Sequence, residues 1–252
     1  MFAAEPPSTD YDLRFHIAGF PVRVHPLFWL MGVILGARSG SGIQLVIWIL
    51  VIFVSILVHE LGHALMMRRF GQSARIVLYM MGGLAIPESS AWGGVPSRSR
   101  SPSEQILISI AGPAAGFLLA AFVVGLIFAS GGSFQLDFSR SLFAPWNFIL
   151  PENANDHWYD LVHCMLWVNV FWGIVNLLPV YPLDGGQIAR EVLVSHDPYD
   201  GMARSLWLSV IVGGALAVIG MVMLHSIFMA LLFGSLAFSS YQILQQYGGG
   251  RW

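Results

Sequence analysis

Charge is scarce in this sequence. It contains no lysine, and charged residues make up 10% of its 252 positions, against roughly 25% in an ordinary soluble domain. The mean hydropathy is +0.68, and 56% of the residues are hydrophobic. The formal net charge is −2, and no basic patch is interleaved with aromatic residues, so the sequence argues against nucleic-acid binding. The composition indicates a polytopic membrane protein instead.

Cysteine is nearly absent as well. The single cysteine, Cys164, lies in an apolar segment, where we expect a small buried side chain. One cysteine makes neither an intrachain disulfide nor a cysteine-rich metal site.

Long apolar runs are what the chain does contain. They predict an all-α polytopic membrane protein of about six transmembrane helices, with small β-hairpin or re-entrant elements on the cytoplasmic side. The β elements are expected within residues 13–26 and 74–87, and segment 130–160 is expected to be a polar loop. The predicted spans are residues 27–37, 42–67, 105–129, 160–180, 205–223 and 226–246.

The arginines divide unevenly between the two sides of the predicted membrane. With a cytoplasmic N-terminus, Arg38 and Arg140 lie outside. The other ten then lie inside: Arg14, Arg23, Arg68, Arg69, Arg75, Arg98, Arg100, Arg190, Arg204 and Arg251. Cytoplasmic loops carry an excess of positive residues, so we expect an integral protein of a bacterial-type inner membrane with its N-terminus in the cytoplasm.

One predicted span carries side chains that are costly in hydrocarbon. The segment SILVHELGHALMM (55–67) contains two histidines and a glutamate, and ionisable residues within membrane segments are usually functional. His59 and His63 are four residues apart and share a helix face, so they can bind one metal ion. Glu60 can reach a metal-bound water, as in zinc hydrolases. The alternative is a hydrogen-bonded histidine pair beside a buried glutamate.

A third protein ligand is expected, because catalytic zinc usually has three and one open position. Glu88 and Glu104 are candidates, but Asp184 in NLLPVYPLDGG (176–186) is favoured. The second and fourth spans run in the same direction, which brings HELGH and Asp184 toward the same leaflet. Prolines also break the fourth helix there. The alternative role for Asp184 is to cap the following helix.

These motifs together resemble the site-2 protease family of intramembrane zinc metalloproteases. The resemblance rests on HELGH, on Gly112-Pro113 in the third span and on NLLPVYPLDGG, and it covers at least residues 43–190. Where the family has GPxxN, this chain has GPAAG, with Gly116 in place of asparagine. We expect a single membrane-embedded metalloprotease domain over 1–252, and no PDZ or nucleotide-binding regulatory domain is evident.

The resemblance also implies a set of site residues. His59, His63 and Asp184 would hold one zinc ion per chain, and Glu60 would be the catalytic base. Asn176 would match the asparagine thought to help hold the substrate carbonyl or oxyanion, although a helix–helix hydrogen bond is an alternative role. The implied substrate is a membrane-spanning protein in the lipid bilayer, cut near the cytoplasmic side in regulated intramembrane proteolysis.

Two questions stay open at this point. The same cluster of His, Glu and Asp could serve a metal-ion transporter or a metal-binding membrane protein, although the ionisable residues gather at one depth rather than along a path. A catalytically dead scaffold would more naturally have lost one of the four residues. The segment 76–87 could offer an edge strand to an extended substrate, or it could be a structural plug over the site.

Overall fold

The computed structural model describes residues 5–37, 40–80, 82–87, 100–139, 144–152 and 154–249. Glu88 and the arginines at 38, 98, 140 and 251 lie outside them. The chain divides into two compact units. The first, here called the sheet unit, contains the described parts of 5–97 and 111–174. The second, the hairpin unit, contains those of 98–110 and 175–249.

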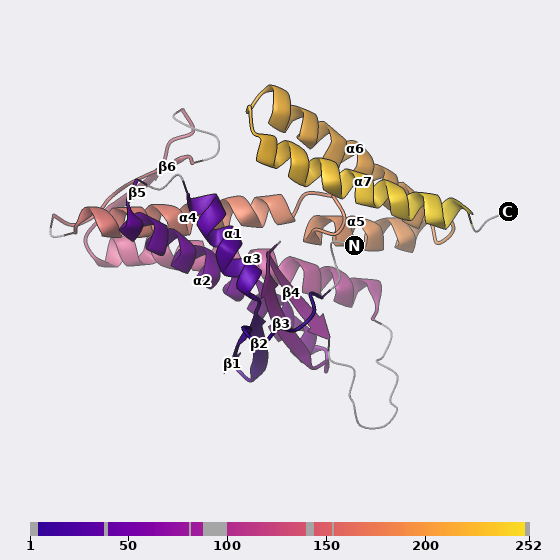
Figure 1. Ribbon diagram of the computed structural model, residues 1–252, viewed down its shortest axis with the longest axis horizontal. Coiled ribbons are helices and arrows are strands. Elements are labelled where there is room, and N and C mark those ends of the chain that lie inside the picture. The colour runs from indigo at the N-terminus through magenta and orange to yellow at the C-terminus, as the bar shows by residue number, and fades with distance from the viewer. Residues whose placement is uncertain are drawn as a thin grey trace. The chain divides into compact units, whose positions relative to one another are not determined.

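The described residues are mostly helical, as predicted, with two small sheets. The helices are α1 Pro26–Gly36, α2 Gly42–Arg69, α3 Pro102–Ala129, α4 Asp156–Asn176, α5 Asp184–His196, α6 Gly201–Val222 and α7 Ile227–Gly249. The strands are β1 Leu13–Ile17, β2 Phe20–Val24, β3 Ala74–Tyr79, β4 Gly82–Pro87, β5 Ser133–Leu136 and β6 Trp146–Ile149 (Figure 1).

Four of the described helices are long and apolar enough to cross a membrane. They are α2, α3, α6 and most of α7, whereas α1 is apolar but shorter. Helix α4 is not among the four, and it carries Asp156, Asp160 and Asn169 along its length. The structure therefore confirms an apolar helical protein but not the predicted count of six spans.

Helix α4 also differs from the predicted span 160–180 at both ends. It begins at Asp156, where an acidic residue in the first turn is favourable. It ends at Asn176, three residues before Pro179, which cannot continue a helix. The segment 130–160, expected to be a loop, contains strands β5 and β6, which pair antiparallel from Ser133↔Ile149 to Leu136↔Trp146.

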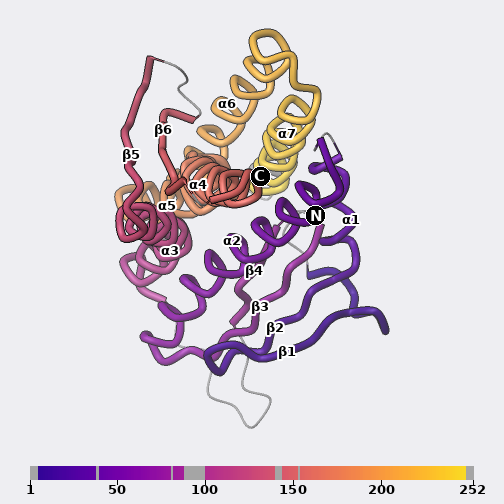
Figure 2. Tube along the Cα trace, turned by 90° about the vertical axis from the view of Figure 1, so that its left-hand side faces the viewer, coloured from indigo at the N-terminus to yellow at the C-terminus, as the bar shows by residue number. Residues whose placement is uncertain are grey.

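A four-stranded sheet in the order β1-β2-β3-β4 is the base of the sheet unit. Both expected β elements are present, as antiparallel pairs β1–β2 and β3–β4. The sequence did not reveal that β2 and β3 pair in parallel, with Val22 opposite Ile76, and so join them. Helix α2 packs against β3 and β4, and Figure 2 shows the strands side by side. Strands β1 and β4 are the two edges.

The C-terminal end of α2 is fixed to this sheet. Arg68 donates a 2.8 Å hydrogen bond to the carbonyl oxygen of Ala18 in the β1–β2 turn. Its guanidinium also lies 4.6 Å from the ring centroid of Phe20, a favourable cation–π arrangement. The sheet therefore holds the last turn of the helix that carries HELGH.

An acidic N-terminal strap, residues 5–12, crosses β2 and β3. Arg23 donates to Asp12 at 3.0 Å and to Glu5 at 2.9 Å, and Arg75 donates to Glu5. Burial alone would raise the pKa of the Asp12 carboxyl. Hydrogen bonds from Thr9, together with the hydrogen bond and positive charge of Arg23, outweigh that effect and lower the pKa to about 2.

This lowered pKa predicts a pH-dependent contribution of the strap to stability. The contribution is fully present above the ordinary pKa of 3.8 and is lost as the pH falls through about 2. In detergent, Asp12→Asn should lower the unfolding temperature at pH 7 relative to the wild type, and this difference should shrink between pH 4 and pH 2. Asp10→Asn, an exposed position of the same strap, is the control. A difference that stays constant with pH would contradict the assignment.

Candidate metal centre

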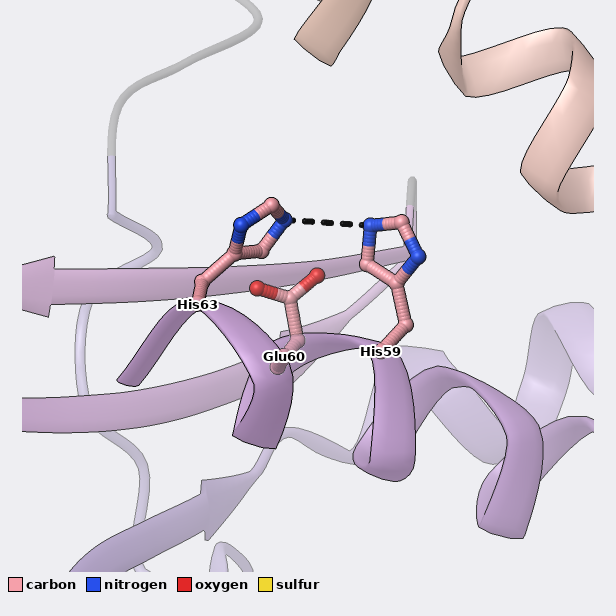
Figure 3. A group of neighbouring side chains, drawn as sticks. All are labelled: His59, Glu60 and His63. Atoms are coloured by element: carbon pink, nitrogen blue, oxygen red, sulfur yellow. Dashed lines mark hydrogen bonds between the residues drawn. The ribbon is translucent and has the colours of Figure 1, made fainter. Parts of the chain in front are cut away.

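His59, Glu60 and His63 come together on α2, as the i, i+4 spacing predicts. All three are buried, and each offers a ligand atom within 4.8 Å of the others. Figure 3 shows the two imidazoles turned toward each other, with the carboxylate beside them. Among the described residues, this is the one group of three or more His, Cys, Asp or Glu side chains close enough to share a metal ion.

The two imidazoles have the geometry of a shared metal site. Their Nε2 atoms are 3.2 Å apart, and their rings are nearly perpendicular, at 80°. Two nitrogens bound to one tetrahedral zinc at 2.0–2.1 Å are about 3.3 Å apart. Without a metal, the same gap allows one ring to donate a hydrogen bond to the other. The histidine pair therefore fits a zinc ion with little rearrangement.

Two glycines make room for this group. A Cβ at Gly112, on α3, would overlap with Nε2 of His63 and crowd Nε2 of His59. A Cβ at Gly83, on β4, would overlap with the side chain of Glu60. The backbones of α3 and β4 therefore come directly against the metal-binding nitrogens and the carboxylate. Any larger residue at 112 would occupy the space that a metal ion needs.

A buried hydrogen bond supports the turn before the first histidine. Asn169 on α4 donates to Ser55 Oγ at 2.9 Å and to the carbonyl oxygen of Met165 at 2.8 Å. Ser55 lies four residues before His59 and therefore on the same face of α2. Gly116, which stands where the family has asparagine, lies against the Asn169 side chain. Asn169 thus fixes α2 relative to α4 one turn from the site.

Tyr79, the last residue of β3, lies close enough to Glu60 for the negative charge of Glu60 to act on its hydroxyl. Burial raises the pKa of the Tyr79 hydroxyl, and the negative charge of Glu60 raises it further. The phenol therefore keeps its proton throughout the neutral range and remains an O–H donor near the carboxylate.

Asn176 and Asp184 belong to the hairpin unit. Asn176 is the last residue of α4 and Asp184 the first of α5, and both are buried. The N-cap position of α5 is held by Leu183, without a side-chain cap hydrogen bond, and Asp184 follows it as the first helical residue. Glu104 does cap a helix: it accepts from the Ser101 amide at 3.1 Å, while Ser101 Oγ accepts from the Glu104 amide at 3.2 Å.

Sequence reasoning missed four residues around the histidines: Ser55, Tyr79, Gly83 and Asn169. Ser55 could have been found from its helical spacing to His59. Gly83 could not be singled out from the sequence, because its contact with Glu60 depends on how β4 packs against α2. Asn169 carried no spacing signal, since its partner is on another helix.

Comparison with known proteins agrees with this site. The family model of peptidase family M50 matches residues 47–220, which include both histidines, Glu60, Asn176 and Asp184. A zinc metalloprotease of Methanocaldococcus jannaschii is 27% identical over 214 residues, covering 83% of this chain and 53% of that protein. Stage IV sporulation protein FB of Bacillus subtilis is 27% identical over 184 residues, covering 73% of this chain and 51% of that protein.

A solved structure shows the same fold. The site-2 protease from Methanocaldococcus jannaschii matches with a TM-score of 0.56 and 23% identity, over 93% of this chain and 95% of that one. The chain spans about half the length of the two relatives named above. The resemblance to site-2 proteases is confirmed, because the family model covers more than half of the sequence: the chain belongs to peptidase family M50.

Proposed function

We propose that this chain is a zinc-dependent intramembrane endopeptidase that hydrolyses peptide bonds in membrane-spanning proteins. The observation that carries the proposal is the buried group His59, Glu60 and His63 within an apolar helix. Buried ionisable residues in such a helix require a function or a partner, and the spacing of the two Nε2 atoms suits zinc. Family membership supports hydrolysis over metal transport.

Three side chains would hold the zinc ion. His59 and His63 would each offer an imidazole nitrogen and Asp184 a carboxylate oxygen, a three-donor set of the kind that catalytic zinc sites use. Asp184 is supported by its burial at the start of α5 and by the prolines that open the backbone before it. This set would then belong to a single metalloprotease domain.

The reaction needs a base and a donor to the carbonyl oxygen. When bound, zinc supplies a water of lowered pKa and polarises the substrate carbonyl. The Glu60 carboxylate would accept a proton from the attacking water as the C–O bond forms and return it to the amide nitrogen as the C–N bond breaks. Asn176 offers amide hydrogens to the carbonyl oxygen as negative charge develops there. Burial around the site excludes bulk water, which strengthens each of these interactions.

An extended substrate would pair with the free edge of β4. A transmembrane helix hides its carbonyls in hydrogen bonds, so the scissile segment must first unwind. Strand β4 pairs only with β3 in the described sheet, and Gly83 lies against the catalytic carboxylate. Strand addition at this edge would place the substrate backbone beside Glu60. The plug considered for this segment would leave that edge unused.

The remaining helices complete the membrane domain. We propose that α1 and α4 also cross the bilayer, which gives six spans, with the N-terminus and most arginines in the cytoplasm of a bacterial-type cell. HELGH lies near the arginine-rich end of α2, so cleavage would occur near the cytoplasmic side. The product would be a fragment released into the cytosol, as in regulated intramembrane proteolysis.

Zinc content and proteolysis test the proposed function together. The purified wild type should contain about one zinc per chain, His59→Ala and Asp184→Ala should lose it, and Glu60→Gln should keep it while losing cleavage of a model transmembrane substrate. Loss of zinc from Glu60→Gln would make Glu60 a ligand and favour transport. A wild type that binds no zinc would contradict the proposal.

A single methyl group at position 112 should disturb the site. Gly112→Ala places a Cβ on the two Nε2 atoms, so zinc affinity should fall by about tenfold or more. Gly125→Ala is the matched control, because it lies on the same helix and, apart from that helix's own nearby backbone, no atom lies within 4 Å of the new Cβ. Zinc titration of the detergent-solubilised protein measures both. Equal affinities for the two variants would refute the close approach of α3.

Crosslinking tests the edge-strand proposal. In a Cys164→Ser background, Ala85→Cys places the only cysteine on β4, and Glu60→Gln keeps the bound substrate uncleaved. The cysteine at position 85 should then form a disulfide with a cysteine placed near the scissile bond of the substrate. Leu13→Cys, on the other edge strand β1, should not. Gel shifts under oxidising conditions report the product. Equal crosslinking at both edges, or none at Ala85→Cys with substrate bound, would count against pairing with β4.

A further inference from the structure

The segment between α4 and α5 leaves backbone N–H and C=O groups outside any helix. Residues 177–183 contain Pro179 and Pro182 and are not helical. In a membrane protein, open backbone needs partners, because unsatisfied N–H and C=O groups are costly in hydrocarbon. Some partners are local: Leu178, Val180 and Leu183 donate to nearby carbonyls of the same segment and of the end of α4. The backbone N–H and C=O groups of Tyr181 lie outside a helix and need partners from elsewhere.

Two buried serines form hydrogen bonds with both backbone polar groups of Tyr181, its N–H and its carbonyl oxygen. Its N–H donates to Ser209 Oγ on α6 at 3.0 Å, and Ser240 Oγ on α7 donates to its carbonyl oxygen at 3.4 Å. The two side chains are among the most enclosed polar groups described, at 1% and 0% exposed. Ser209 Oγ also donates to the carbonyl oxygen of Ser205 at 2.9 Å, which orients its lone pairs.

The two serines lie where α6 and α7 approach closely. Gly213, one turn after Ser209, packs against Ala237, which is three residues before Ser240. Val180 is completely buried against Phe233 and neighbouring side chains of the same helix pair. A displacement of one helix relative to the other would therefore stretch at least one of the two hydrogen bonds to Tyr181.

Tyr181 is in direct contact with the start of α5. A Cβ at Gly186 would overlap with the Tyr181 nitrogen and the preceding carbonyl, so the first turn of α5 rests on this peptide. Gln187 in the same turn donates to the Pro182 carbonyl oxygen at 3.2 Å and accepts from Gln105 at 3.1 Å. Because these contacts join Tyr181 and Pro182 to the first turn of α5, a shift of the Tyr181 peptide would also shift Asp184, which begins that turn.

We propose that Ser209 and Ser240 are positioning residues that clamp the Tyr181 peptide between α6 and α7 and so fix Asp184 for metal binding. This inference rests on the proposed function, in which Asp184 is a zinc ligand. It gives the last two helices a role in the metal site without placing any ligand on them. It also makes zinc affinity sensitive to the packing of α6 against α7.

Serine-to-alanine variants with controls on the same helices test the clamp. Ser209→Ala and Ser240→Ala each remove a bond to Tyr181. Ser205→Ala and Ser235→Ala remove hydroxyls that bond only to Met202 and Leu232 of their own helices. The whole chain in detergent is used throughout, and Asp184→Ala is included as the ligand variant. Thermal unfolding identifies any variant that is misfolded.

Three readouts separate positioning from general destabilisation. Zinc affinity should fall about 10- to 100-fold in both clamp variants, as for other partners that orient metal ligands, and stay within about twofold of wild type in the controls. Cobalt-substituted protein should show weakened and shifted visible bands in the clamp variants alone. In metal-free protein, amide hydrogen exchange at Tyr181 should accelerate at least tenfold in Ser209→Ala and remain unchanged in Ser205→Ala.

The outcomes distinguish failure of the clamp from failure of the proposed function. If Asp184→Ala loses zinc but the clamp variants match their controls in affinity and in the cobalt spectrum, the clamp is overturned and the metal site stands. If the wild type binds no zinc, or Asp184→Ala binds it normally, the proposed function fails and the positioning role fails with it, whatever the exchange data show.

Discussion

The cost of placing ionisable groups in an apolar helix is the constraint on which the rest of the structure depends. Two imidazoles and a carboxylate on α2 must be satisfied without bulk water, and one metal ion can satisfy all three by direct ligation and through a bound water. This requirement explains why the three side chains are buried together and why other elements come close to them. A loosely packed site would leave them partly hydrated and unable to control a single water molecule.

Close backbone approach and buried hydrogen bonds meet that requirement. Gly112 and Gly83 bring α3 and β4 against the histidines and Glu60, and Asn169 fixes the turn that precedes His59. In the hairpin unit, serine hydroxyls play the same part for the broken backbone before Asp184. Both units thus use small residues and single polar side chains on neighbouring helices to hold buried groups in place, as is common in membrane helix packing.

The sequence predicted what depends on local periodicity and chemistry. The HELGH group follows from the helical repeat alone, and the two hairpins follow from short alternating segments bounded by glycine and proline. The parallel pairing of β2 with β3 and the contacts of Gly83 and Asn169 could not be predicted, because each joins residues far apart in the chain. The predicted span extended to Val180 because the apolar run continues that far, whereas α4 ends at Asn176, just before the break expected at Pro179.

The central claim is that His59 and His63 hold a catalytic zinc ion with a carboxylate and an open position. X-ray absorption at the zinc edge of the purified wild type tests it most directly. The account predicts four light ligands at 2.0–2.2 Å, with the multiple scattering of two imidazoles and the remaining shell made of oxygen. A first shell of oxygen alone, or one that contains a single imidazole, would contradict it.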